Sequence, residues 1–242
     1  MIKDGIEKKE KVQSILMIGQ SNMAGRGNVK DVDPIVNPKC FMLRMGRWQP
    51  MSEPINPDRS VHSENNCSGV SLAASFADEF SKCTGAEVGL IPCADGGTRI
   101  EQWQPGELLY DHAVYMTRLA MRTSDLAGII WHQGESNCKT FTDEEYSKLF
   151  LNMVTSLRKD LNAENVPFIM GEISDKISVE KWDFTDRILE MNSLLRKLQK
   201  QIPLSGVASV ENLNIMNDGI HFDAKSLRIL GKRYFEEYKK LL

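Results

Sequence analysis

Short apolar runs alternate along the chain with longer stretches in which apolar residues recur every three or four positions. The short runs have the length and composition of buried strands, and the longer stretches have the period of amphipathic helices. Strands are predicted over 15–18, 88–92, 128–131, 166–170 and 206–210. Helices are predicted over 70–81, 110–122, 143–161, 185–201 and 223–241. This alternation predicts an α/β fold with a parallel sheet whose strands are connected by crossover helices.

Residues 27–66 do not follow this pattern, because five prolines interrupt the periodicity. Within this stretch only 40–48 suggests regular structure, a hairpin that turns at Met45-Gly46. We therefore expect an irregular insertion that covers one edge of the sheet. No linker rich in Pro, Gly or Ser divides the chain, so residues 1–242 are expected to form a single domain.

Composition and charge narrow the range of functions. Hydrophobic residues make up 41% and charged residues 26%, as in a globular protein with a substantial core. The formal net charge of -3 supplies no basic field, so a nucleic-acid partner is not expected. The apolar run at 14–19 is too short for a signal peptide or a membrane span, which predicts a cytoplasmic protein that does not enter membranes. Neither the five cysteines nor the four histidines show metal-ligand spacing, so no metal site is predicted.

Four polar or glycine-containing segments come after predicted strands along the chain. Because ligands bind beyond the carboxyl ends of the strands in an open parallel sheet, these segments are expected to face one crevice. Each segment alone is typical of a turn, but together they supply a hydroxyl, an imidazole, carboxylates and backbone donors. They are GQSNM at 19–23, ADGGT at 94–98, HQGESN at 132–137 and NDGIH at 217–221.

These segments, in this order, resemble the SGNH hydrolase superfamily. The resemblance is to carbohydrate esterase family six and to the acetylxylan esterase-like and sialate O-acetylesterase-like proteins. It is carried by GQSNMAG at 19–25, GGT at 96–98, WHQGES at 131–136 and DGIH at 218–221. The resemblance implies a flavodoxin-like three-layer α/β/α sandwich with a central parallel sheet of about five strands. It also implies hydrolysis of acyl esters without a metal or an organic cofactor.

Ser21 is the candidate nucleophile, and a serine hydroxyl needs a neighbouring base to take its proton. His221 is the candidate base, and Asp218, three residues earlier, can orient the imidazole and stabilise its protonated form. Glu135 is the alternative acidic partner of the histidine. Its other predicted role is to hold the nucleophile loop by hydrogen bonds.

Attack on an ester carbonyl creates an oxyanion that preorganised donors must stabilise. The expected donors are the backbone N–H groups of Ser21 and Gly97 and the side-chain amide of Gln133. Gly97 lacks a Cβ, so its N–H can approach a ligand closely.

Three side chains flank the catalytic segments and are candidates for substrate binding. Arg99 and Arg26 can bond sugar hydroxyls, and Trp103 can stack on a pyranose ring. A buried tryptophan and solvated arginines are equally compatible with the sequence.

The sequence therefore predicts a serine esterase that removes small acyl groups, most simply O-acetyl groups, from a small-molecule or oligosaccharide ester. One alternative is an SGNH thioesterase or lysophospholipase, which would need an apolar groove for the acyl chain. An alternative of another class is a non-catalytic carbohydrate-binding protein on the same fold. The sequence leaves open which acylated compound is the substrate and whether the protein forms oligomers.

Overall fold

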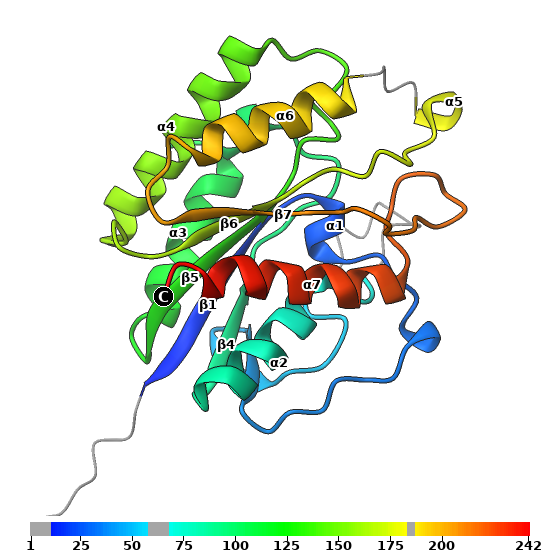
Figure 1. The fold of residues 1–242 in the computed structure, drawn as a ribbon. Coiled ribbons are helices and arrows are strands. Elements are labelled where there is room, and N and C mark those ends of the chain that lie inside the picture. The colour runs from blue at the N-terminus through cyan, green and yellow to red at the C-terminus, as the bar shows by residue number, and fades with distance from the viewer. Residues whose placement is uncertain (1–10, 58–67, 183–186) are drawn as a thin grey trace, which may run out of the picture.

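A seven-stranded sheet forms the centre of the protein in a computed structural model that describes residues 11–57, 68–182 and 187–242 (Figure 1). The strand order is β3-β2-β4-β1-β5-β6-β7. All neighbouring strands are parallel except β2 and β3, which form an antiparallel hairpin. The strands are β1 (Val12–Gly19), β2 (Cys40–Arg44), β3 (Arg47–Pro50), β4 (Val88–Pro92), β5 (Ser124–His132), β6 (Phe168–Gly171) and β7 (Ser205–Ala208).

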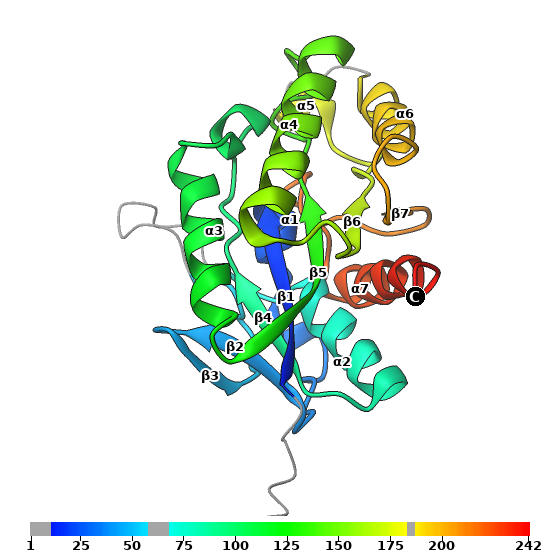
Figure 2. The same cartoon turned by 90° about the vertical axis from the view of Figure 1, so that its left-hand side faces the viewer.

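Helices cover both faces of the sheet (Figure 2). One face carries α3 (Leu108–Ala120), α4 (Asp143–Leu161) and α6 (Ile188–Gln199). The other face carries α2 (Leu72–Thr84) and α7 (Ala224–Lys239). Shorter helical segments are α1 (Ser21–Ala24), η1 (Val29–Asp31), η2 (Ile100–Trp103) and α5 (Val179–Trp182). The predicted α/β sandwich with a mostly parallel sheet is therefore confirmed.

Two apolar cores, one on each face, explain why the strand segments read as unbroken hydrophobic runs. In β1, Leu16 and Ile18 pack toward α3, α4 and α6. Ile15 and Met17 pack toward α2 and α7. Successive side chains of a strand point to opposite faces, so a strand buried on both faces must be apolar at every position.

The five predicted strands correspond to β1, β4, β5, β6 and β7, and the predicted helices correspond to α2, α3, α4, α6 and α7. The bounds of β4 and α4 match the prediction. The predicted helix at 185–201 starts at residues outside the described part of the chain, and α6 begins at Ile188.

The expected strand count of about five is too low, because the predicted hairpin is present and belongs to the sheet. Met45 and Gly46 take left-handed conformations, with φ of 49° and 72°, in the two-residue turn between β2 and β3. β2 then pairs in parallel with β4 and buries Cys40, Met42 and Leu43. Burial of these side chains favours extension of the sheet over a loop that only covers its edge. The end of the predicted insertion, at 58–66, lies outside the described residues.

The end of β1 packs directly on the end of β5, and this contact requires glycine at position 19. Gly19 has a φ of 127°, and a Cβ there would lie 2.2 Å from the backbone oxygen of His132. The N–H of Gln20 donates to the same oxygen at 2.8 Å. The segments that follow β1 and β5 therefore start side by side.

Close contact between α2 and α7 generates a prediction about stability. A Cβ on Gly231 would lie 2.0 Å from the backbone oxygen of Leu72 and 2.2 Å from Oγ of Ser75. Gly231→Ala should therefore push the helices apart and lower the free energy of unfolding by roughly 1–3 kcal/mol or more. Lys225→Ala, on the exposed side of the same helix, should change it by less than about 0.5 kcal/mol. Urea denaturation measures both variants, and equal stability of the two would contradict this account.

Candidate active site

Ser21 is the first residue of α1, immediately after the turn that ends β1. Its side chain is only 6% exposed. Its backbone N–H has no acceptor among the residues that the structure describes, as expected at the start of a helix. The hydroxyl and a free backbone donor are thus presented at the carboxyl end of the central strand.

His221 brings an imidazole to this hydroxyl from the other end of the chain. Its Nε2 atom lies 2.9 Å from Oγ of Ser21, and its Nδ1 atom lies 2.8 Å from Oδ2 of Asp218. Both distances are those of hydrogen bonds. The three residues that the sequence selected are therefore brought together in one chain of contacts.

Asp218 is held by the backbone of its own loop. Its Oδ1 atom accepts from the N–H groups of Ile220 and His221, both at 3.0 Å. Burial raises the pKa of the Asp218 carboxyl, but these N–H groups and the His221 ring outweigh that effect, so the pKa lies below its ordinary value. Asp218 thus stays ionised beside the imidazole.

Asn22, the residue after Ser21, connects both flanks of His221 to Glu135. Its Oδ1 atom accepts from the N–H of Phe222 at 3.1 Å, and its Nδ2 atom lies 3.4 Å from the backbone oxygen of Ile220. The same Nδ2 atom donates to Oε1 of Glu135 at 2.7 Å. No role for Asn22 follows from the sequence, in which its only signal is its position beside the serine.

Glu135 is fully buried and bonds to Asn22, whereas it is Asp218 that bonds to the ring of His221. Oε1 of Glu135 also lies 3.7 Å from Nε2 of His132, whose Nδ1 contacts the hydroxyl of Tyr234 at 2.9 Å. Burial lowers the pKa of the His132 ring, and the Glu135 charge partly opposes this effect. Glu135 and His132 are thus buried together, and Glu135 contacts Asn22, the residue that follows Ser21.

Two of the three expected oxyanion donors are available. Gly97 is exposed with a φ of 70°, and its N–H has no acceptor within 11–57, 68–182 or 187–242. The amide nitrogen of Gln133 already donates to the backbone oxygen of Thr98 at 3.1 Å and to Oδ1 of Asn137 at 2.7 Å. An amide nitrogen carries two hydrogens, so Gln133 has no donor left for an oxyanion in this arrangement. The expectation for Gln133 is corrected accordingly.

The expected stacking role of Trp103 is also corrected. Its side chain is 1% exposed, packs edge-on against Trp131, and donates from Nε1 to Oγ1 of Thr98 at 3.1 Å. A ring buried in this way cannot meet a sugar. Arg99 is partly exposed but bonds to the backbone oxygen of Ser136 and to Glu101. Arg26 bonds to the backbone oxygen of Gly25.

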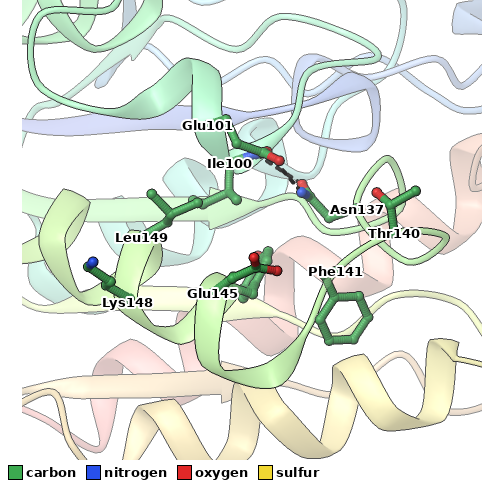
Figure 3. Close-up of a pocket in the computed structure, with 9 residues that line it drawn as sticks. Ile100, Glu101, Asn137, Thr140, Phe141, Glu145, Lys148 and Leu149 are labelled. Atoms are coloured by element: carbon green, nitrogen blue, oxygen red, sulfur yellow. Dashed lines mark hydrogen bonds between the residues drawn. The ribbon is translucent and has the colours of Figure 1, made fainter.

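A pocket of about 330 Å³ lies between η2 and the first turns of α4 (Figure 3). Figure 3 shows that Glu101 and Asn137 are joined by a hydrogen bond at this pocket. Nδ2 of Asn137 donates to Oε2 of Glu101 at 3.0 Å. Ser21 and His221 do not line the pocket, but Asn137, which does, accepts a hydrogen bond from the side-chain amide of Gln133. The pocket therefore flanks the site without containing it.

In the described part of the chain, no group of three or more His, Cys, Asp or Glu side chains is arranged to hold a metal ion. The described helices also include none with the length and hydropathy of a bilayer span.

Known proteins with similar sequences carry consistent descriptions. A family model described as carbohydrate esterase, sialic acid-specific acetylesterase matches residues 11–240. A probable carbohydrate esterase of Arabidopsis thaliana, At4g34215, is 30% identical over an alignment of 248 residues. The alignment covers 93% of this chain and 90% of that protein.

Solved structures show the same fold. The crystal structure of the Arabidopsis protein superposes with a TM-score of 0.80 at 25% identity and covers 95% of this chain and 98% of its own. NanS superposes with a TM-score of 0.74 at 15% identity, covering 96% and 97%. A carbohydrate acetylesterase from Xanthomonas citri superposes with a TM-score of 0.65 at 18% identity, covering 95% and 56%.

The lowered pKa of Asp218 generates a prediction about acid stability. A carboxyl whose pKa is lower in the folded protein stabilises the fold at pH values above 3.8, the pKa of the same carboxyl in the unfolded chain. This contribution to stability is lost as the pH falls through the pKa of the folded state. Asp218→Asn removes this titration, so the variant should lose less stability than the wild type between about pH 6 and pH 3. Urea denaturation across this range measures the difference. Parallel curves for the two proteins would be the contrary result.

Proposed function

The chain belongs to the carbohydrate esterase, sialic acid-specific acetylesterase family of the SGNH hydrolase superfamily, and from this premise we propose that it removes O-acetyl groups from sugars by serine catalysis. Membership makes it a hydrolase that acts on carbohydrate esters. We infer that the acyl group removed is acetyl because the family is described as an acetylesterase. The observation that carries the mechanism is the 2.9 Å contact between Oγ of Ser21 and Nε2 of His221.

In the proposed reaction, Oγ of Ser21 attacks the ester carbonyl carbon while its proton passes to Nε2 of His221. Asp218, 2.8 Å from Nδ1, stabilises the imidazolium that forms. When the tetrahedral intermediate collapses, the sugar oxygen takes that proton and leaves, and the acetyl group stays on Ser21. A water molecule then attacks the acyl carbon and gives its proton to His221. When this second tetrahedral intermediate collapses, His221 returns the proton to Oγ of Ser21 and acetate leaves.

The N–H groups of Ser21 and Gly97 are the proposed oxyanion donors, since each is without another acceptor among the described residues. Gln133 acts indirectly in this proposal, because it bonds to the backbone oxygen of Thr98 next to Gly97. Trp103 bonds to the hydroxyl of the same threonine. Both side chains restrain Thr98, the residue after Gly97, and thereby hold the loop that carries the Gly97 donor. Preorganised donors cost no reorganisation during the reaction.

Asn22 and Glu135 are the proposed positioning residues. The Asn22 side chain forms hydrogen bonds with the backbone on both sides of His221. The Glu135 carboxylate accepts from Nδ2 of Asn22 and so fixes the orientation of the amide. An amide with Nδ2 held by Glu135 must present its Oδ1 to the N–H of Phe222. This arrangement keeps the imidazole in reach of the adjacent Ser21.

The nucleophile and the acyl preference are tested with p-nitrophenyl acetate and p-nitrophenyl octanoate. Ser21→Ala should lower kcat on the acetate by roughly 10³-fold or more, because no other hydroxyl takes the place of Oγ. The wild type should hydrolyse the acetate much faster than the octanoate. Undiminished activity of the variant would eliminate Ser21 as nucleophile, and comparable rates on both esters would favour a thioesterase or lysophospholipase.

Two isosteric variants separate the acidic residues. Asp218→Asn removes the charge that stabilises the imidazolium, whereas Glu135→Gln keeps an oxygen that can accept from Asn22. The first should lower kcat at least about tenfold more than the second. Steady-state kinetics on p-nitrophenyl acetate provides the comparison, and the opposite ranking would reassign the acid to Glu135.

A further inference from the structure

The segment that follows β3 brings the side chain of Asn56 to the backbone of Ala94, at the start of the loop that carries Gly97. Oδ1 of Asn56 accepts from the N–H of Ala94 at 3.2 Å, and Nδ2 donates to the backbone oxygen of Ala94 at 3.0 Å. Nδ2 also donates to the backbone oxygen of Pro57 at 3.0 Å. Asn56 is 4% exposed, and both of its amide hydrogens have acceptors. The segment expected only to cover an edge of the sheet therefore also contacts the catalytic region.

The Asn56 amide takes the place of a neighbouring strand. The two residues that flank Ala94 donate their N–H groups to β1, at 2.9 and 3.0 Å. Backbone groups of alternate residues in an extended segment point to opposite sides, so those of Ala94 point away from β1, toward the side where β2 lies. The pairing of β2 with β4 ends at Leu90. Asn56 thus supplies the donor and the acceptor that the buried backbone of Ala94 needs.

The loop between Ala94 and Thr98 is held at both ends. The hydroxyl of Thr98 donates to the backbone oxygen of Asp95 at 2.7 Å, and the backbone oxygen of Thr98 accepts from Gln133 at 3.1 Å. Gly97 lies between these ties, with a φ of 70°. Only two residues separate it from Ala94, so a shift of Ala94 must be taken up by the turn that presents the Gly97 N–H.

We propose that Asn56 is a positioning residue of this esterase, which holds the Gly97 N–H at the place where the oxyanion forms. A donor stabilises the transition state only at hydrogen-bond distance from that oxygen, so its position decides its effect. Asn56 is buried and bonded to backbone groups, and it therefore acts through Ala94 rather than on the substrate. This proposal rests on the proposed function and assigns to the segment after β3 a part in catalysis.

Two variants test the positioning role. Asn56→Ala removes both bonds to Ala94, whereas Asn56→Asp is close in size, keeps the acceptor and removes the donor. Each variant should lower kcat and kcat/KM for p-nitrophenyl acetate by the same factor, roughly tenfold, because an oxyanion donor acts in the transition state and not on the bound ester. Asn56→Asp carries the test if Asn56→Ala does not fold.

Gly231→Ala is the matched control, because it should destabilise the contact between α2 and α7 without touching the loop at 94–98. At a temperature where circular dichroism shows every variant folded, its kcat should stay within about twofold of the wild type. An equal fall in kcat for Gly231→Ala would mean that general destabilisation explains the result. Unchanged kcat in the Asn56 variants, or a change confined to KM, would mean that Asn56 only satisfies the backbone of Ala94. Either outcome overturns the proposal.

A spectroscopic measurement separates this proposal from the proposed function. In protein labelled with ¹⁵N-glycine, the amide resonance of Gly97 should move in Asn56→Asp and stay in place in Gly231→Ala. A Gly97 resonance that neither Asn56 variant moves would refute the positioning role regardless of the kinetics. If that resonance moves but Ser21→Ala hydrolyses p-nitrophenyl acetate at the wild-type rate, the proposed nucleophile is wrong, while Asn56 still sets the position of the Gly97 amide.

Discussion

The contact between Ser21 and His221 joins side chains 200 positions apart, and the rest of the site is arranged around it. It depends on the packing of β1 against β5, because Gly19 lets the two strands end in direct backbone contact. It also depends on Asn22, which bonds to the backbone on both sides of His221. Neither constraint is local in sequence, so the proposed nucleophile and base meet only when the sheet is complete.

Two carboxylates near this contact occupy different environments. Asp218 has a side chain that is 37% exposed and accepts two backbone hydrogen bonds, which together with His221 lower its pKa. Glu135 is fully buried and bonds to the Asn22 amide. An ionised group beside an imidazole suits stabilisation of positive charge, and a buried group bonded to an amide suits positioning. This difference in surroundings supports the division of roles proposed for them.

The predictions from sequence failed where a side chain had more than one possible partner. Gln133 was expected to offer its amide to an oxyanion, but Thr98 and Asn137 take both of its hydrogens. Trp103 was expected to meet a sugar, but it packs in the core. A tryptophan near a motif looks the same in sequence whether its ring faces solvent or the core, because exposure depends on distant elements that pack against it.

The sequence by itself determined the alternation of strands and helices, the parallel sheet and the segments that converge at its edge. Strands buried on both faces need unbroken apolar runs, and parallel strands place their following loops at one end, so both features can be read locally. Only the tertiary structure decided that residues 40–50 add two strands, that Asn22 joins Glu135 to the His221 loop, and that Asn56 bonds to the backbone of Ala94. Hydrogen-bond partners and burial are set by contacts between residues far apart in the chain, and no local pattern records them.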